Sequence, residues 1–151
     1  MVVALDDACE RFDEVVMAVH SDVALGLIAD PSPAEAELLG AIPYQQNRAV
    51  LHTDTRLMPQ RRSAWASWNY HLIDRPTDRT TVTYHMNRLQ SLAAGRDYLV
   101  TLNLSEAIDP DAIIRSIDYA HPVFTPGGVA AQRLWAEVSG TRRTHYCGAY
   151  W

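Results

Sequence analysis

Two neighbouring segments with alternating apolar and polar residues place the strongest constraint on the fold of this chain. They are residues 65–73 (WASWNYHLI) and 80–87 (TTVTYHMN), and the connection between them is rich in turn-forming residues. Alternation with a period of two is typical of β-strands, and two such segments joined by a turn form a hairpin. The pattern therefore predicts an antiparallel hairpin in the middle of the chain.

The same alternation sorts the side chains of the hairpin between two faces. The first segment places Trp65 on one face and Trp68 and Tyr70 on the other, and the second places His85 opposite Tyr84. Two interpretations are open for such a sheet. It covers a core on one side and meets solvent on the other, or one face forms the floor of an apolar pocket with a few polar groups.

The rest of the chain predicts a mixed α+β fold. Residues 14–19 (EVVMAV) are a short apolar run, typical of a buried parallel strand, and Ser21 or Asp22 is expected to cap a helix after it. Ser32 and Glu35 have the spacing of a capping box at the start of another helix. Further strands are expected at 48–53, 98–103, 117–124 and 145–149, and a helix at 129–138. The sum is a mixed, largely antiparallel sheet with flanking helices, preceded by one strand–helix unit.

Composition excludes several classes of function. All 13 basic residues are arginine, so no lysine can form a Schiff base or serve a Walker-type phosphate loop. The net charge of −5 argues against nucleic-acid binding. No apolar run approaches the roughly 20 residues of a transmembrane helix. With no secretory signal, we expect a cytoplasmic protein in which Cys9 and Cys147 are reduced.

The familiar catalytic and cofactor motifs are missing. No glycines have the GxGxxG spacing that lets a pyrophosphate approach a helix, and there is no GxSxG, HExxH or CxxC. The six histidines form no i, i+4 pair, so we expect no metal site. The chain opens on a buried-type strand and closes on the apolar segment HYCGAYW, and we therefore expect it to be a piece of a longer protein.

Seven segments, in order, carry a family resemblance: FDEVVMAVHSDVAL, PYQQNRAVLHTDTRLMP, RRSAWASWNY, VTYHMNRLQ, VTLN, YAHPVF and HYCGAYW. Together they cover nearly all of the chain from Phe12 on. In them the chain resembles the carboxyl-side half of bacterial flavin-containing amine-oxidase-like oxidoreductases, a group of predicted NAD/FAD-binding proteins.

The resemblance implies three parts. Residues 1–42 would be a strand and helices of the FAD domain, 43–124 the mixed sheet of the substrate domain, and 125–151 a helix and a strand that returns to the FAD domain. The glycine-rich segments that hold FAD in the family are not in this sequence, and neither is the lysine that many amine oxidases place near the flavin. The chain would therefore hold only the edges of an FAD site.

The resemblance also implies a function and a set of residues. The parent protein would transfer a hydride between FAD and an apolar, lipid-like substrate. The expected pocket residues are Trp65, Trp68 and Tyr70, with His85 as general acid or base. The expected cofactor contacts are His20, Ser21, Cys147 and Gly148. The expected protein partner is the missing FAD-binding half or a second copy of the chain.

Two other interpretations remain open. The chain is a non-enzymatic α+β domain that binds a small apolar ligand or a partner protein, or it is a degenerate remnant without activity. Because the glycine-rich fingerprint is missing, we expect the isolated chain to be inactive.

Overall fold

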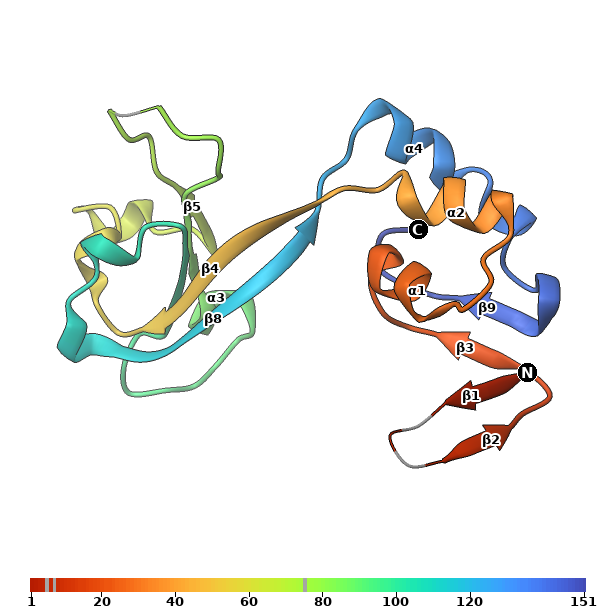
Figure 1. The fold of residues 1–151 in the computed structure, drawn as a ribbon. Coiled ribbons are helices and arrows are strands. Elements are labelled where there is room, and N and C mark those ends of the chain that lie inside the picture. Colours follow the sequence, from red (N-terminus) through yellow and green to blue (C-terminus); the bar gives the residue numbers. More distant parts are fainter. Residues whose placement is uncertain (5, 7, 75) are drawn as a thin grey trace. The chain divides into compact units, whose positions relative to one another are not determined.

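The computed structural model describes residues 1–4, 6, 8–74 and 76–151 (Figure 1). They form two compact units, one built from Met1–Gln45 and Pro122–Trp151 and the other from Gln46–His121. The fold is mixed α+β with a largely antiparallel five-stranded sheet, as the sequence predicted. None of the helices in these residues is long and apolar enough to cross a membrane.

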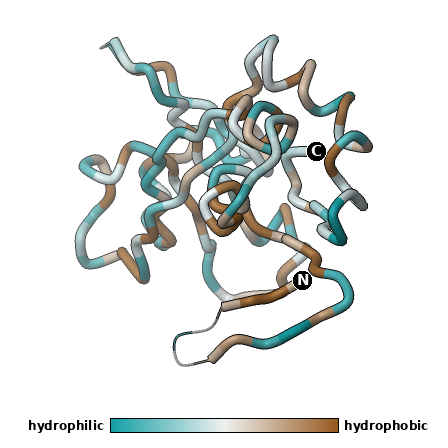
Figure 2. The backbone as a smooth tube through the Cα atoms, turned by 45° about the vertical axis from the view of Figure 1, so that its right-hand side comes forward, coloured by the Kyte–Doolittle hydropathy of each residue, from teal (hydrophilic) through white to brown (hydrophobic). Residues whose placement is uncertain are grey.

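The first unit combines two small sheets with short helices. Its strands are β1 (Val2–Ala4), β2 (Cys9–Arg11), β3 (Val15–Met17) and β9 (Thr144–Tyr146), and its helices are α1 (Ser21–Leu27), α2 (Pro33–Gly40) and α4 (Pro126–Gln132). β1 pairs with β2 in antiparallel fashion, and Figure 2 shows β1 as the more hydrophobic of the two. β3 pairs with β9 in parallel, which confirms the parallel pairing predicted from the apolar run at 14–19. The prediction that this strand is buried is wrong, because among the described residues β9 is its one partner in a two-stranded sheet and Val16 is 64% exposed.

Helix α2 begins at the predicted capping box. The Glu35 N–H donates to Ser32 Oγ (3.2 Å), and the Ser32 N–H donates to Glu35 Oε2 (2.7 Å). Pro33 occupies the first turn, where its missing N–H costs nothing. The helix packs into the core of the unit, whose buried members are Ala24, Leu38, Leu39, Ala131, Val138 and Tyr146.

Glu35 is itself buried, with 2% of its surface exposed. Its carboxylate accepts hydrogen bonds from the Tyr146 hydroxyl (2.9 Å) and the Arg142 guanidinium (2.9 Å), and Arg142 also pairs with Asp30 (2.6 Å). Burial acts to raise the pKa of Glu35, but the hydrogen bonds from Ser32, Tyr146 and Arg142 outweigh it and leave the pKa below its ordinary value. The ionised carboxylate therefore joins α2 to β9.

The second unit is a five-stranded sheet with irregular segments over one face. Its strands are β4 (Tyr44–His52), β5 (Trp68–Tyr70), β6 (Val82–His85), β7 (Leu99–Leu102) and β8 (Ile113–Pro122), and a short helix α3 (Met86–Leu89) follows β6. The order is β5-β6-β7-β4-β8, with antiparallel pairing of β5 with β6, β6 with β7, and β7 with β4. β8 runs beside β4 in the opposite direction (Figure 1). The predicted hairpin is therefore confirmed as β5 and β6.

The buried face of this sheet is largely polar. Thr83 and Thr101 face each other across β6 and β7, and neither is exposed to solvent. Met58 and Trp65, from the segment after β4, cover this face and pack against Leu99. The core of the second unit is thus a small apolar cluster beside a set of buried hydroxyl and imidazole groups.

Several element boundaries differ from the predictions. The strand predicted at 65–73 is reduced to β5, because the Asn69 side chain bonds both the N–H (3.2 Å) and the C=O (2.9 Å) of Ala66 and forms a local turn there. The helix predicted at 129–138 begins earlier as α4, because Thr125 caps it with Oγ1 bonded to the Gly128 N–H (3.0 Å). The strand predicted at 117–124 begins earlier as well, as β8.

The buried carboxylate gives the first unit an acid sensitivity. Because the pKa of Glu35 is lowered on folding, its stabilising contribution is present above the ordinary carboxylate pKa and is lost as the pH falls below it. We expect Glu35→Gln to lower the free energy of unfolding by about 1.5–3 kcal/mol at pH 7, the usual loss for a hydrogen bond to a charged group. Urea unfolding at pH 7 and pH 3.5 measures both effects.

The matched control is Glu37→Gln, since Glu37 lies on the same helix but is exposed. It should unfold like the parent chain at both pH values. An acid-induced loss of stability as large in Glu35→Gln as in the parent chain would contradict the assignment of this pH dependence to Glu35.

Candidate functional site

The first candidate site lies where the parallel strands β3 and β9 end. Val15 pairs with Thr144 and Met17 with Tyr146, so the segments that follow both strands leave the same edge of the sheet. The Cys147 N–H donates to the Met17 carbonyl (3.1 Å) and extends the pairing by one residue. The carboxyl edge of adjacent parallel strands is the place where open α/β sheets bind ligands.

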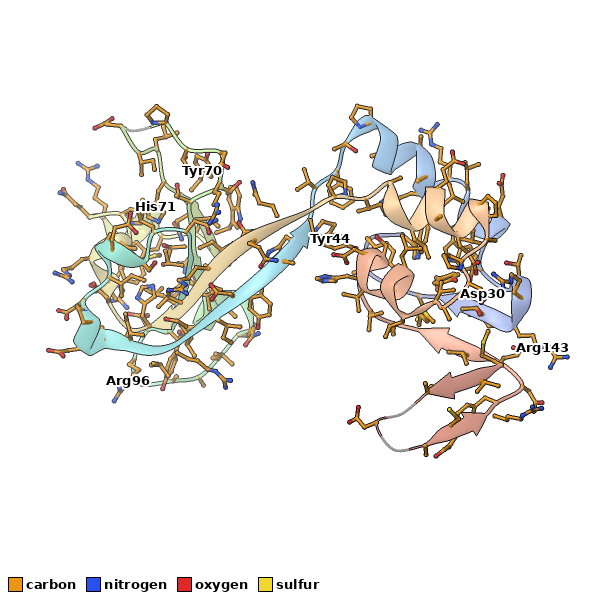
Figure 3. All side chains as sticks on the ribbon, in the orientation of Figure 1. Asp30, Tyr44, Tyr70, His71, Arg96 and Arg143 are labelled. Atoms are coloured by element: carbon orange, nitrogen blue, oxygen red, sulfur yellow. The ribbon has the colours of Figure 1, made fainter. Side chains whose placement is uncertain are left out.

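A tyrosine from a distant part of the chain organises the loop after β3. The Ser21 N–H donates to the Tyr44 hydroxyl oxygen (2.8 Å), and the two hydroxyl groups lie 3.2 Å apart. The His20 ring stacks on Tyr44 at a centroid distance of 4.5 Å (Tyr44 is labelled in Figure 3). His20 is the N-cap residue of α1 and makes no side-chain cap bond, so the prediction of Ser21 or Asp22 as the cap is wrong. The Tyr44 hydroxyl takes over that role.

The segment after β9 buries two aromatic side chains at the same edge. Tyr150 is 2% exposed, and its ring lies edge-on to Tyr44 at 6.5 Å. Neither its hydroxyl nor Trp151 Nε1 forms a well-aligned hydrogen bond with a described residue, although the nearby Trp151 indole N–H acts to lower the pKa of Tyr150. Burial raises the pKa of Tyr150 to about 12, so the hydroxyl stays neutral. Buried polar groups without well-aligned hydrogen bonds cost free energy.

Gly148 is required by this arrangement. A Cβ at this position would lie 1.9 Å from Cε1 of Tyr150, far inside van der Waals contact. The Tyr150 ring therefore packs directly on the Gly148 backbone. The structure brings all four predicted cofactor contacts to one edge: His20 and Ser21 after β3, and Cys147 and Gly148 after β9.

The start of α1 at this edge is unsuited to a phosphate group. The Cys147 thiol is exposed at this edge, whereas the Tyr150 hydroxyl and the Trp151 indole N–H are buried and the two rings lie 5.3 Å apart. The start of α1 has no glycine-rich turn, and Asp22 adds a negative charge to its first turn. A pyrophosphate would be repelled there, because helix N-termini that bind phosphate present free N–H groups without a competing carboxylate.

The second candidate site is the open face of the sheet in the second unit. Trp68 pairs with Tyr84 and Tyr70 with Val82 in the β5–β6 register, so these side chains share a face. Trp68 is 53% and Tyr70 51% exposed, and their rings are 6.1 Å apart. This is a half-open aromatic and apolar surface, which we call the aromatic face. It is defined by the exposed Trp68 and Tyr70 and the partly buried Tyr84, and Val82 lies buried beneath them with 1% of its surface exposed.

The opposite, buried face holds His85. Its Nε2 lies 2.9 Å from Asp97 Oδ1, and Arg62 pairs with the other carboxylate oxygen of Asp97 (2.9 Å). The carboxylate accepts from Nε2, so Nε2 carries a proton in this pair. Nδ1 is buried and has no partner among the described residues. The Trp65 ring lies edge-on to His85 at 5.3 Å and donates its indole N–H to the Pro59 carbonyl.

The structure therefore divides the predicted pocket residues. Trp68 and Tyr70 lie together on the aromatic face, whereas Trp65 and His85 lie together beneath the sheet. A ligand resting on Trp68 cannot reach His85, because the sheet lies between them. The reason is the strict alternation of strand side chains, which assigns residues 68 and 85 to opposite faces once Trp68 pairs with Tyr84.

Sequence reasoning missed the partners that give these residues their geometry. Tyr44 lies far along the chain from Ser21, and Asp97 is separated from His85 by a helix and a loop. No local pattern links either pair. For Tyr150, the signal in the sequence was an aromatic pair two residues after Gly148.

The comparisons with known proteins add no relative. A scan against models of known families finds no match to this chain, and a search of the curated proteins finds none either.

The contact between Gly148 and Tyr150 can be tested by adding one methyl group. We expect Gly148→Ala to displace the Tyr150 ring and to lower the free energy of unfolding by about 1–3 kcal/mol, the usual cost of overpacking a core. Urea unfolding and the near-UV circular dichroism of the aromatic residues measure the two effects.

Gly26→Ala is the matched control, because a Cβ at Gly26 in α1 meets no atom within 4 Å. It should stabilise the chain by about 0.5–1 kcal/mol through helix propensity. Unchanged stability and unchanged near-UV spectra in Gly148→Ala would show that Tyr150 does not pack on this glycine.

Proposed function

We propose that this chain is part of an FAD-dependent oxidoreductase similar to the bacterial flavin-containing amine-oxidase-like group, acting on an apolar, lipid-like substrate. The observation that supports it best is the buried Tyr150 hydroxyl, which has no well-aligned hydrogen bond to a described residue, at the carboxyl edge of two parallel strands. When bound, FAD would supply the hydride-transfer chemistry. The free thiols of Cys9 and Cys147 agree with a cytoplasmic setting as part of the same proposal.

The first unit would contact the ring end of the cofactor. Tyr150 Oη can donate or accept a hydrogen bond, Trp151 Nε1 can only donate, and both groups are pre-positioned by the contact of Tyr150 with Gly148. The phosphates need a glycine-rich loop or basic side chains, which this edge does not have. A second polypeptide, the FAD-binding half of the parent protein, would supply them.

The second unit would bind the apolar substrate through the aromatic face. Trp68 and Tyr70 together present a broad apolar surface while their polar edges remain in water, which suits a long hydrocarbon with a polar end. Acid–base chemistry by His85 is not part of binding at this face, since His85 lies beneath the sheet with Asp97.

A second function is favoured by the aromatic face alone. A half-exposed tryptophan–tyrosine pair on a sheet is also the kind of surface with which non-enzymatic domains bind small apolar ligands. This function needs no cofactor, so the two proposals differ in whether FAD binds.

Cofactor binding is tested by comparing two buried tyrosines. Purified protein is titrated with FAD and followed by flavin absorbance near ~450 nm and by flavin fluorescence. We expect Tyr150→Phe to weaken FAD binding while raising the free energy of unfolding of the free protein by about 1 kcal/mol, because it removes a buried hydroxyl that has no well-aligned hydrogen bond to a described residue.

Tyr146→Phe is the matched control. Its hydroxyl is equally buried but donates to Glu35, so its loss should destabilise the protein and leave FAD binding unchanged. If the parent chain binds no FAD, alone or with the FAD-binding half, the flavoenzyme proposal is wrong for this chain. If both variants bind FAD like the parent, Tyr150 is not a cofactor contact.

Ligand binding at the aromatic face is tested with a fluorescent fatty-acid analogue. We expect Trp68→Ala to weaken its binding about tenfold or more, since the loss of a large aromatic contact is worth about 1.5–3 kcal/mol. Phe124→Ala removes a comparably exposed aromatic residue of the first unit and should leave binding unchanged. Equal effects of both substitutions would mean that the probe binds exposed apolar residues without preference.

A further inference from the structure

A chain of hydrogen bonds crosses the buried face of the sheet in the second unit. His52 Nε2 lies 2.7 Å from Thr101 Oγ1, Thr101 Oγ1 lies 2.7 Å from Thr83 Oγ1, and Thr83 Oγ1 lies 2.7 Å from His71 Nε2. These side chains come from β4, β7, β6 and the residue after β5. His52, Thr101 and Thr83 are 0% exposed, whereas His71 is half-buried.

A backbone N–H determines which atom donates and which accepts in each of these hydrogen bonds. The Asp54 N–H donates to His52 Nδ1 (3.1 Å), so Nδ1 carries no proton and neutral His52 is protonated at Nε2. Nε2–H then donates to Thr101, the Thr101 hydroxyl donates to Thr83, and the Thr83 hydroxyl donates to His71. His71 Nε2 must therefore be the acceptor, and neutral His71 carries its proton on Nδ1.

His71 also attaches the carboxyl end of the edge strand β5 to β6. Its N–H donates to the Thr81 carbonyl (2.9 Å), and the Thr81 hydroxyl donates to the His71 carbonyl (2.8 Å). β5 has only three residues and pairs with β6 alone. A short edge strand depends strongly on the contacts at its ends, and the bond from Thr83 is the one that engages the His71 ring (Figure 3 labels Tyr70 and His71).

Protonation of His71 is incompatible with the donor–acceptor order of the hydrogen bonds that run from His52 to His71. An Nε2–H on His71 would face the Thr83 hydroxyl, which already donates toward it. Either that hydroxyl loses its acceptor, or every bond reverses and His52 must carry its proton on Nδ1, against the Asp54 N–H. Both outcomes leave a buried donor without an acceptor, which weakens the chain.

The charged groups around His52 and His71 do not make protonation of His71 compatible with these hydrogen bonds. At the His52 end, Asp54 favours the protonated ring, but its carboxylate is taken up by Arg56 (2.6 Å) and by the Asp109 N–H (2.8 Å). Burial lowers the pKa of His52 and that of His71, and for His71 no charge of the described residues opposes it. The other imidazole on this face of β6, that of His85, is paired with Asp97.

We propose that the chain from His52 through Thr101 and Thr83 to His71 is an acid-sensitive tether that holds β5 on the sheet and releases it when His71 is protonated. Since β5 carries Trp68 and Tyr70, the tether controls how firmly half of the aromatic face is held. The proposal concerns the free protein and does not depend on FAD or on a substrate.

The experiment measures amide hydrogen exchange of the segment that contains β5 and His71 between pH 7.5 and pH 5.5. Protection factors are used, because they remove the pH dependence of intrinsic exchange. In the parent chain we expect protection to fall about tenfold over this range, the ratio for the loss of roughly one buried hydrogen bond. In Thr83→Val we expect low protection that no longer depends on pH.

Thr81→Val is the matched control. Thr81 lies on the same side of the sheet two residues away, is equally buried and also bonds His71, but through the backbone carbonyl instead of the ring. Removing the Thr81 hydroxyl should lower the protection factors of the β5 segment at both pH values. The tenfold decrease between pH 7.5 and pH 5.5 should remain. If the protection factors decrease as much between pH 7.5 and pH 5.5 in Thr83→Val as in the parent chain, the proposal is wrong.

Nitrogen-15 NMR of the histidine rings in the parent chain provides a test that needs no substitution. At pH 7.5 the neutral tautomers should be Nε2–H for His52 and Nδ1–H for His71. An Nε2–H tautomer at His71 would contradict the proposed donor–acceptor order of the hydrogen bonds from His52 to His71, and with it the tether.

Discussion

The parallel pairing of β3 with β9 is the interaction on which the first unit depends. Parallel strands need a long crossover connection, and here the connection contains α1, α2 and the whole second unit. Closing so long a loop costs entropy, which the core of the unit and the buried bond between Tyr146 and Glu35 offset. The same pairing brings the loop after β3 and the segment after β9 to one edge, so the candidate cofactor site exists only because these strands meet.

The second unit follows a different rule, because its sheet buries a largely polar face. Buried hydroxyl and imidazole groups cost free energy unless they find partners, and among the described side chains of this unit His85 Nδ1 is the exception that has none. The chain between His52 and His71 satisfies this condition with three short bonds, at the cost of allowing only one arrangement of protons. The apolar side of the sheet is left half open as a consequence, and the same backbone thus carries a sealed polar layer and an accessible aromatic face.

Much of the fold could be predicted because its signals are local. The alternation in residues 65–73 and 80–87 predicted the hairpin, and Ser32 with Glu35 predicted the start of α2. Predictions failed where a side chain redirected the backbone, as Asn69 does when it bonds Ala66 and shortens β5. Such a bond competes with the strand ladder, and neither alternation nor propensity reveals which of the two prevails.

The sequence by itself determined the α+β class, the positions of the central strands and the residue types available to a site. Only the tertiary structure decided that Tyr44 caps α1 at Ser21, that Asp97 orients His85, and that the face with Trp68 stays open. Periodicity and capping act between residues a few positions apart, whereas a hydrogen-bond partner or a buried face depends on which distant segments pack together. That choice is made by the free energy of the whole unit, to which no short segment contributes alone.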